Sequence, residues 1–148
     1  MQKISIRPIE FGDTDLIVKW RNSDAVRLNF IDRRELTKEI HENWMNTKVL
    51  VGNVVQFIIC VDGTPVGSVY LRDIDKKHQK AEFGIFIGEE LKQGHGIGQE
   101  AGKQILKYAF DELNLNRVFL RVLAENEHAI NCYKKIGFVQ EGYARERR

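Results

Sequence analysis

Three glycines at alternate positions, Gly94, Gly96 and Gly98, stand just before a helical pattern. Glycines carry no side chain, so the backbone can come close to a ligand. The first turn of a helix adds unpaired N–H groups and a partial positive charge. Together these features predict an anion site, in particular for phosphate. The helix dipole contributes about 0.3–1 kcal/mol, so several N–H bonds to one pyrophosphate would matter more.

Two common phosphate-binding loops fit this stretch poorly. A P-loop ends in Gly-Lys-Ser/Thr, whereas Gly98 is followed by Gln99 and Glu100. A dinucleotide-binding loop places Gly-x-Gly-x-x-Gly directly after a strand, but here the last glycine of that pattern would fall on Gln99, and residues 89–93 intervene. Glu125 follows the next predicted strand and could bind a ribose. A nucleotide site therefore remains an alternative, as does a glycine loop that binds nothing.

The spacing of apolar residues predicts the elements that position this loop. Residues 81–87 are typical of a strand, and residues 97–113 of a helix of about four turns. Residues 118–123 form the next predicted strand, and a short helix is expected between a cap at Asn126 and Gly137. Strand–helix–strand order implies a parallel pair with a right-handed crossover. The loop should therefore lie inside a central β-α-β unit.

The rest of the chain predicts further strands and two helices. Asp62-Gly63 is a strong hairpin signal, and Thr37 is placed to cap a helix. Residues 23–36 are ambiguous. The predicted elements are a strand at 3–7, a helix opening at Gly12, a helix at 37–45, hairpin strands at 54–61 and 66–74, and a last strand at 138–143.

Composition excludes several classes of protein. The 148 residues fit a single domain, 1–148, and 23 Lys and Arg against 21 Asp and Glu are too balanced to indicate nucleic acid. Cys60 and Cys132 lie in no metal-ligand spacing, so no metal is expected. No apolar stretch approaches the roughly 20 residues that span a bilayer. We therefore expect a cytoplasmic protein without a membrane or nucleic-acid partner.

Two motifs resemble those of one family. Gln93-Gly94-His95-Gly96-Ile97-Gly98 resembles the pyrophosphate-binding signature of the GNAT superfamily of acyl-CoA N-acyltransferases, Gln/Arg-x-x-Gly-x-Gly/Ala. Residues 126–138 resemble its second signature, Asn-x-x-Ala-x-x-x-Tyr-x-x-x-Gly-Phe. The resemblance covers residues 3–143. Trp20-Arg21-Asn22 and His41-x-x-Trp44 further resemble the branch with ribosomal-protein N-terminal, spermidine and amino-sugar acetyltransferases.

The resemblance implies a fold and a co-substrate. The fold class is α/β (α+β), a mixed and mostly antiparallel sheet of six to seven strands with helices on both faces. The co-substrate is acetyl-CoA, whose pyrophosphate would lie on residues 93–98. Its pantetheine arm would lie between diverging strands, on the backbone of Ile85, Phe86 and Ile87, as in strand addition. Asn126 and Asn131 would also contact the pantetheine.

The implied reaction is direct attack of a primary amine on the thioester. An amine with a pKa near 10.4 must lose its proton, at a cost of about 4–5 kcal/mol at pH 7. Glu82, an acid within an apolar strand, is the candidate general base, and Tyr133 matches the tyrosine that protonates the thiolate. Some family members carry a glutamate where this chain has Arg121. A water chain, or a purely structural Glu82, therefore remains an alternative.

The acceptor is the least determined part. Arg33, Arg34 and Arg72 favour an amine that also carries an anion, such as a nucleotide-linked amino sugar or an acidic peptide, and argue mildly against spermidine. Acidic residues occur in the same segments, so the arginines being solvated surface residues is the alternative. A protein N-terminus or another small amine also fits. The alternative function is a non-catalytic acyl-CoA-binding module. Relatives continue past the equivalent of Arg145 with a last strand, so we expect that strand to be missing or supplied by a partner, as in a homodimer.

Overall fold

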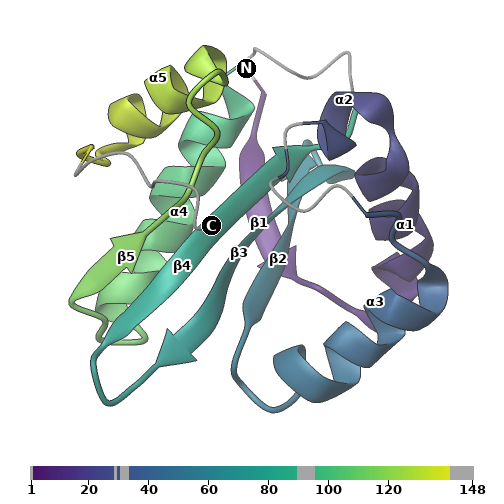
Figure 1. Ribbon diagram of the computed structural model, residues 1–148, viewed down its shortest axis with the longest axis horizontal. Helices are drawn as coiled ribbons and strands as arrows, with labels where there is room; N and C mark the ends of the chain where they lie inside the picture. Colours follow the sequence, from purple (N-terminus) through teal and green to yellow (C-terminus); the bar gives the residue numbers. More distant parts are fainter. Residues whose placement is uncertain (1, 29, 31–33, 90–95, 141–148) are drawn as a thin grey trace, which may run out of the picture.

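A twisted five-stranded sheet lies between two layers of helices in the computed structural model (Figure 1), which describes residues 2–28, 30, 34–89 and 96–140. Strands follow the order β1-β2-β3-β4-β5, antiparallel except for the parallel pair β4 and β5. The elements are β1 (Ile4–Pro8), η1 (Phe11–Asp13), α1 (Thr14–Asn22), α2 (Asp24–Arg27), α3 (Lys38–Trp44), η2 (Met45–Val49), β2 (Val55–Val61), β3 (Thr64–Asp75), β4 (Lys80–Ile87), α4 (Ile97–Asp111), β5 (Arg117–Phe119) and α5 (Glu127–Ile136).

Local signals in the sequence account for several element boundaries. The β2–β3 hairpin turns at Asp62 and Gly63, whose φ angles of 50° and 85° suit the tight turn that Asp-Gly favours. The side chain of Thr37 caps α3 by accepting a hydrogen bond from the backbone N–H of Ile40 at 3.1 Å. Gly137 ends α5 with φ of 126°. These predicted features are confirmed.

The core has two halves, one on each face of the sheet. Successive strand residues point to opposite faces, so each central strand contributes to both halves. One half packs under α4, and the other under α1, α2 and η2, as the layers in Figure 1 show. The predicted mixed sheet with helices on both faces is confirmed. Among the described residues, no helix is long and apolar enough to span a membrane.

The parallel pair is shorter than predicted. β5 contains three residues instead of the six expected at 118–123, and its pairing with β4 ends at Glu82 opposite Phe119. Beyond this point the two strands diverge, so residues 120–123 do not form hydrogen-bonded pairs with β4. Of the predicted strand at 138–143, residues 138–140 are not in a strand, and residues 141–143 lie outside the described part. The described sheet therefore has five strands instead of six to seven.

Gly88, just after β4, leaves room for the largest buried side chain of the second core half. Trp20 is 1% exposed, and a Cβ on Gly88 would overlap its indole ring. We expect Gly88→Ala to lower the free energy of unfolding by about 1–3 kcal/mol, the usual effect of overpacking. Gly12→Ala is the control, because a Cβ there meets nothing within 4 Å. Urea denaturation with equal midpoints for both variants would contradict this expectation.

Candidate active site

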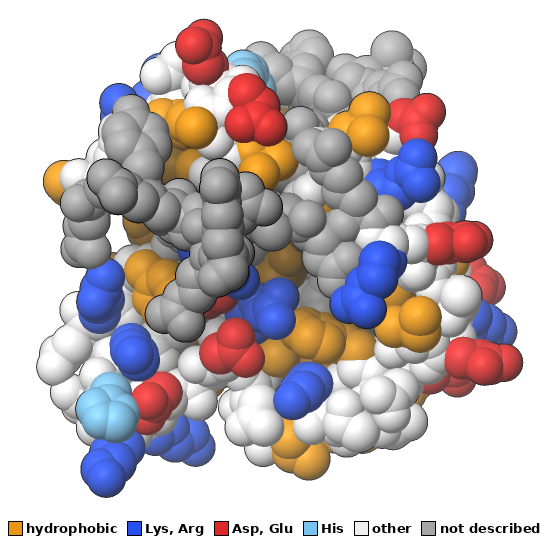
Figure 2. Space-filling view, in the orientation of Figure 1, with side chains coloured by type: hydrophobic (Ala, Val, Ile, Leu, Met, Phe, Trp, Pro, Cys, Tyr) orange, Lys and Arg blue, Asp and Glu red, His pale blue; other side chains and the backbone are white. Residues whose placement is uncertain are grey.

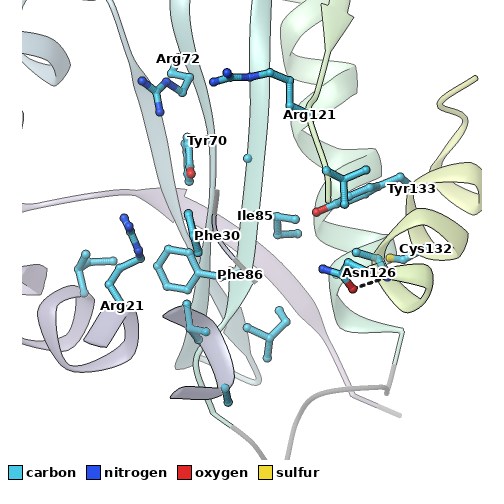
Figure 3. Close-up of a pocket in the computed structure, with 18 of the residues that line it drawn as sticks. Arg21, Phe30, Tyr70, Arg72, Ile85, Phe86, Arg121, Asn126, Cys132 and Tyr133 are labelled. Atoms are coloured by element: carbon cyan, nitrogen blue, oxygen red, sulfur yellow. Dashed lines mark hydrogen bonds between the residues drawn. The ribbon is translucent and has the colours of Figure 1, made fainter. Parts of the chain in front are cut away.

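A cleft of about 1240 Å³ opens where β4 and β5 part. Its walls come from four places: the face of β3 and β4, the start of α4, α5, and the helices α1 and α3. Figure 3 shows side chains from α1, β3, β4 and α5 directed toward a common space. In Figure 2, hydrophobic side chains in the middle of the same view are flanked by basic and acidic ones. The cleft therefore has an apolar floor and charged walls.

The start of α4 forms the anion-binding end of the cleft. Gly96 has φ of 74°, a left-handed conformation that glycine adopts without strain, and α4 begins at Ile97. Gly96, Ile97, Gly98 and Gln99 all line the cleft. The N–H groups of the first helical turn have no intrahelical acceptor, so they suit a phosphate. Predicted ligands Gln93, Gly94 and His95 lie outside the described residues.

The predicted pantetheine contacts lie along the same opening. Ile85, Phe86 and Ile87 of β4 line the cleft beyond the point where β5 pairing stops. Phe86 is 7% exposed and packs edge-to-face on Trp20, with ring centroids 6.3 Å apart. Its side chain therefore belongs to the core, and its backbone is the part available to a ligand.

Two asparagines on α5 line the opposite wall. Asn126 caps the helix, with its Oδ1 accepting from the N–H of Ala129 at 3.3 Å. Its amide nitrogen remains directed to the cleft in Figure 3. Asn131 is exposed and also lines the cleft. Both residues are thus on the wall that the pantetheine arm was predicted to contact, and that contact remains a prediction.

Tyr133 projects from α5 into the cleft. Its ring packs on Phe83 and Phe138, with centroids at 5.9 and 6.2 Å, while Figure 3 shows its hydroxyl directed toward the space beside Ile85. Burial raises the pKa of Tyr133 to about 12, with smaller contributions from Cys132 and Tyr70. The phenol therefore stays protonated at neutral pH and can donate a hydrogen bond to a leaving thiolate.

Glu82 lies in the cleft and is held by an arginine. The guanidinium of Arg121 donates to both carboxylate oxygens of Glu82, from Nε at 3.0 Å and from Nη2 at 3.4 Å. The Glu82 side chain is 12% exposed and that of Arg121 is 57% exposed. Arg121, which stands where some family members carry a glutamate, therefore pairs with the candidate base in the fold.

The Trp20-Arg21-Asn22 motif lies on α1, beside the cleft. The indole N–H of Trp20 donates to Glu89 at 3.1 Å, which ties α1 to the end of β4. Arg21 points into the cleft with its guanidinium carbon 3.9 Å from the centre of the Phe30 ring. Asn22 fixes the following segment through two hydrogen bonds with the backbone of Leu36, at 2.6 and 2.7 Å. Each residue of the motif thus contacts a different part of the structure.

His41, from the His41-x-x-Trp44 motif, is buried beside the cleft. It is 3% exposed and is one of the residues that line the cleft. Its Nδ1 lies 3.1 Å from the hydroxyl of Thr14, while its Nε2 has no hydrogen-bond partner in the described part of the chain. Burial, and then the charge of Arg21, lowers the pKa of His41.

Charges in the cleft are mainly positive. Four arginines and one lysine from the described residues line it, against two glutamates, one of which pairs with Arg121. These side chains are Arg21, Arg34, Arg72, Arg121, Lys135, Glu35 and Glu82. Of the three arginines that were predicted to shape the acceptor pocket, Arg34 and Arg72 line the cleft, and Arg33 lies outside the described residues. Among the described residues, no three His, Cys, Asp or Glu side chains form a group that could hold a metal.

Comparison with known proteins places the chain among acetyltransferases. A family model described as "Acetyltransferase (GNAT) domain" matches residues 3–139. A spermidine N(1)-acetyltransferase of Escherichia coli K12 is 34% identical over 140 residues, which are 94% of this chain and 74% of that protein. An L-amino acid N-acetyltransferase of the same organism is 26% identical over 96% of this chain and 86% of its own length.

Solved structures agree with this result. The crystal structure of spermidine N-acetyltransferase from Vibrio cholerae in complex with CoA and spermine superposes with a TM-score of 0.86. The two sequences are 28% identical, and the match covers 94% of this chain and 82% of that chain. The superposition therefore extends over nearly the whole chain.

Proposed function

The chain belongs to the GNAT acetyltransferase family and is an acetyl-CoA-dependent N-acetyltransferase, and from this premise we propose that its acceptor is a small primary amine that also carries an anionic group. An amino sugar bearing phosphate or an acidic peptide is the expected class. The observation that carries the proposal is the excess of arginine among the side chains that line the cleft, because guanidinium groups bind phosphate and carboxylate well.

In this proposal the chain holds acetyl-CoA at three places. The first turn of α4 binds the pyrophosphate, the backbone of Ile85 to Ile87 binds the pantetheine, and the α5 wall with Asn126 closes the opposite side. These groups fit the co-substrate, since a helix N-terminus with a left-handed glycine and an unpaired strand edge suit a phosphate and an amide chain respectively. The thioester is the acetyl donor.

The chemical steps are assigned to two side chains. The amine nitrogen forms a bond to the acetyl carbon as the carbon–sulfur bond breaks. Glu82, directly or through water, takes the proton that the amine loses, and Tyr133 donates to the sulfur as it leaves. Both side chains line the same cleft. Because the pKa of Tyr133 is raised to about 12, its hydroxyl is still protonated when the carbon–sulfur bond breaks.

A second candidate acceptor is spermidine. Spermidine N-acetyltransferases are among the relatives, including the one at 34% identity. A polyamine carries several positive charges, however, and the arginines lining this cleft would repel it. Since the relatives also include an L-amino acid N-acetyltransferase, membership of the family is compatible with an acceptor that carries a carboxylate.

An amine panel tests the proposal. Release of the CoA thiol is followed with glucosamine, glucosamine 6-phosphate, an L-amino acid, an acidic and a neutral N-terminal peptide, and spermidine. Glucosamine and its 6-phosphate differ only in the anion, and we expect the phosphate to raise kcat/KM at least tenfold, the size of one charge-assisted contact. A preference for spermidine would replace the anionic acceptor by the second candidate. Binding of acetyl-CoA without turnover of any amine would indicate the non-catalytic module.

A further inference from the structure

Tyr70 of β3 lies on the floor of the cleft and has no assigned task. The residue is 9% exposed and belongs to the core half under α1 and α2, yet it also lines the cleft. In Figure 3 its hydroxyl points away from Arg72 and into the open space above Phe86. No described residue forms a hydrogen bond with this hydroxyl. A phenol nine-tenths buried, with an unpartnered oxygen aimed into a binding cleft, is equipped to meet a ligand.

A glycine on the neighbouring strand makes room for this arrangement. Tyr70 pairs with Gly84 across β3 and β4, and a Cβ on Gly84 would overlap the far end of the phenol and its oxygen. The outer end of the Tyr70 ring therefore extends from β3 over the backbone of β4. As a result the hydroxyl sits over β4 two residues beyond Glu82, where the pairing with β5 has already ended.

Tyr70 lines the same cleft as Glu82 and Tyr133, the two groups assigned to proton transfer. Glu82 is two residues from Gly84 on the same strand, so both lie on one face. Tyr70 makes a small contribution to the raised pKa of Tyr133, and the charge of Glu82 makes a small contribution to the raised pKa of Tyr70. Burial raises the pKa of Tyr70 itself, so it remains a neutral group that can both donate and accept.

We propose that the Tyr70 hydroxyl binds the attacking amine of the acceptor by accepting one of its N–H groups, and so directs the nitrogen lone pair toward the thioester. This inference rests on the proposed function, since it concerns the acceptor of the same reaction. Tyr70 neither gains nor loses a proton in the step. The proton lost by the amine passes to Glu82 or water, and Tyr133 donates to the sulfur.

Tyr70→Phe tests the inference, because it removes the oxygen and keeps the ring over Gly84. The probe is glucosamine 6-phosphate, or the panel amine that wild type turns over fastest. We expect kcat/KM for the amine to fall about 3- to 10-fold, the size of one hydrogen bond between neutral groups. The KM for acetyl-CoA and the thermal midpoint should stay unchanged. Tyr108→Phe is the matched control, since Tyr108 packs on Phe57 outside the cleft and should alter neither constant.

Three results would overturn the inference in different ways. Equal amine kinetics for wild type and Tyr70→Phe would show that the hydroxyl does not meet the acceptor. A raised KM for acetyl-CoA with an unchanged KM for the amine would assign the hydroxyl to the donor instead. Wild type that acetylates no amine of the panel would remove the proposed function and this inference with it, whereas the first two results leave the proposed function intact.

Discussion

Tyr133→Phe is expected to lower kcat about 10²- to 10⁴-fold, the usual range for loss of a general acid. The leaving thiolate is the poorly stabilised product of the attack, and the Tyr133 hydroxyl is directed into the cleft beside Ile85. Phenylalanine keeps the packing on Phe83 and Phe138, so the fold should survive. Steady-state kinetics with saturating acetyl-CoA measure the effect, and thermal shift with acetyl-CoA should show unchanged binding.

The pH dependence provides an independent check on the same residue. Because burial raises the pKa of Tyr133 to about 12, the phenol keeps its proton well beyond neutral pH. The wild-type rate should therefore show no decline from ionisation of Tyr133 below about pH 11. A decline between pH 8 and pH 10 that disappears in Tyr133→Phe would contradict the raised pKa. A rate within threefold of wild type for Tyr133→Phe would exclude the role as acid.

Much of the fold was predictable because its boundaries depend on neighbouring residues. Asp62-Gly63 determines its hairpin, and Thr37 and Asn126 cap their helices by bonds that span three residues. The length of β5 was not predictable in this way. Its apolar pattern continues to Leu123, but the strand ends at Phe119 because β4 turns away from it. That divergence depends on the whole sheet, and no local pattern records it.

The same distinction between local sequence signals and long-range packing applies to the residues of the candidate site. Residues carried by sequence motifs, such as Gly98, Asn126 and Tyr133, were predicted and are brought to one cleft. Tyr70 was missed because the position of its ring depends on the space that Gly84 leaves on the neighbouring strand. A polar residue on a strand opposite a glycine is a signal that would have drawn attention to Tyr70.

Glu82 and Arg121 are 39 positions apart, and their pairing could not be read from the sequence. The pairing also allows two interpretations of Glu82. It is either the general base or a structural partner that holds Arg121 in place. If Glu82 is the base, Glu82→Gln should lower kcat about 10²- to 10⁴-fold, because the amide cannot take the proton from the amine. Kinetics with the best amine of the panel, at saturating acetyl-CoA, measure this loss.

A double-mutant cycle separates the two interpretations. Arg121→Gln removes the pair and leaves the carboxylate, so a catalytic Glu82 predicts a rate within about tenfold of wild type for that variant. The double variant Glu82→Gln, Arg121→Gln should then be as slow as Glu82→Gln alone. A structural Glu82 predicts the opposite, since Arg121→Gln would be as harmful as Glu82→Gln and the double variant would recover. Recovery in the double variant would transfer the role of base to a water chain and leave Tyr133 as the only side chain assigned to proton transfer.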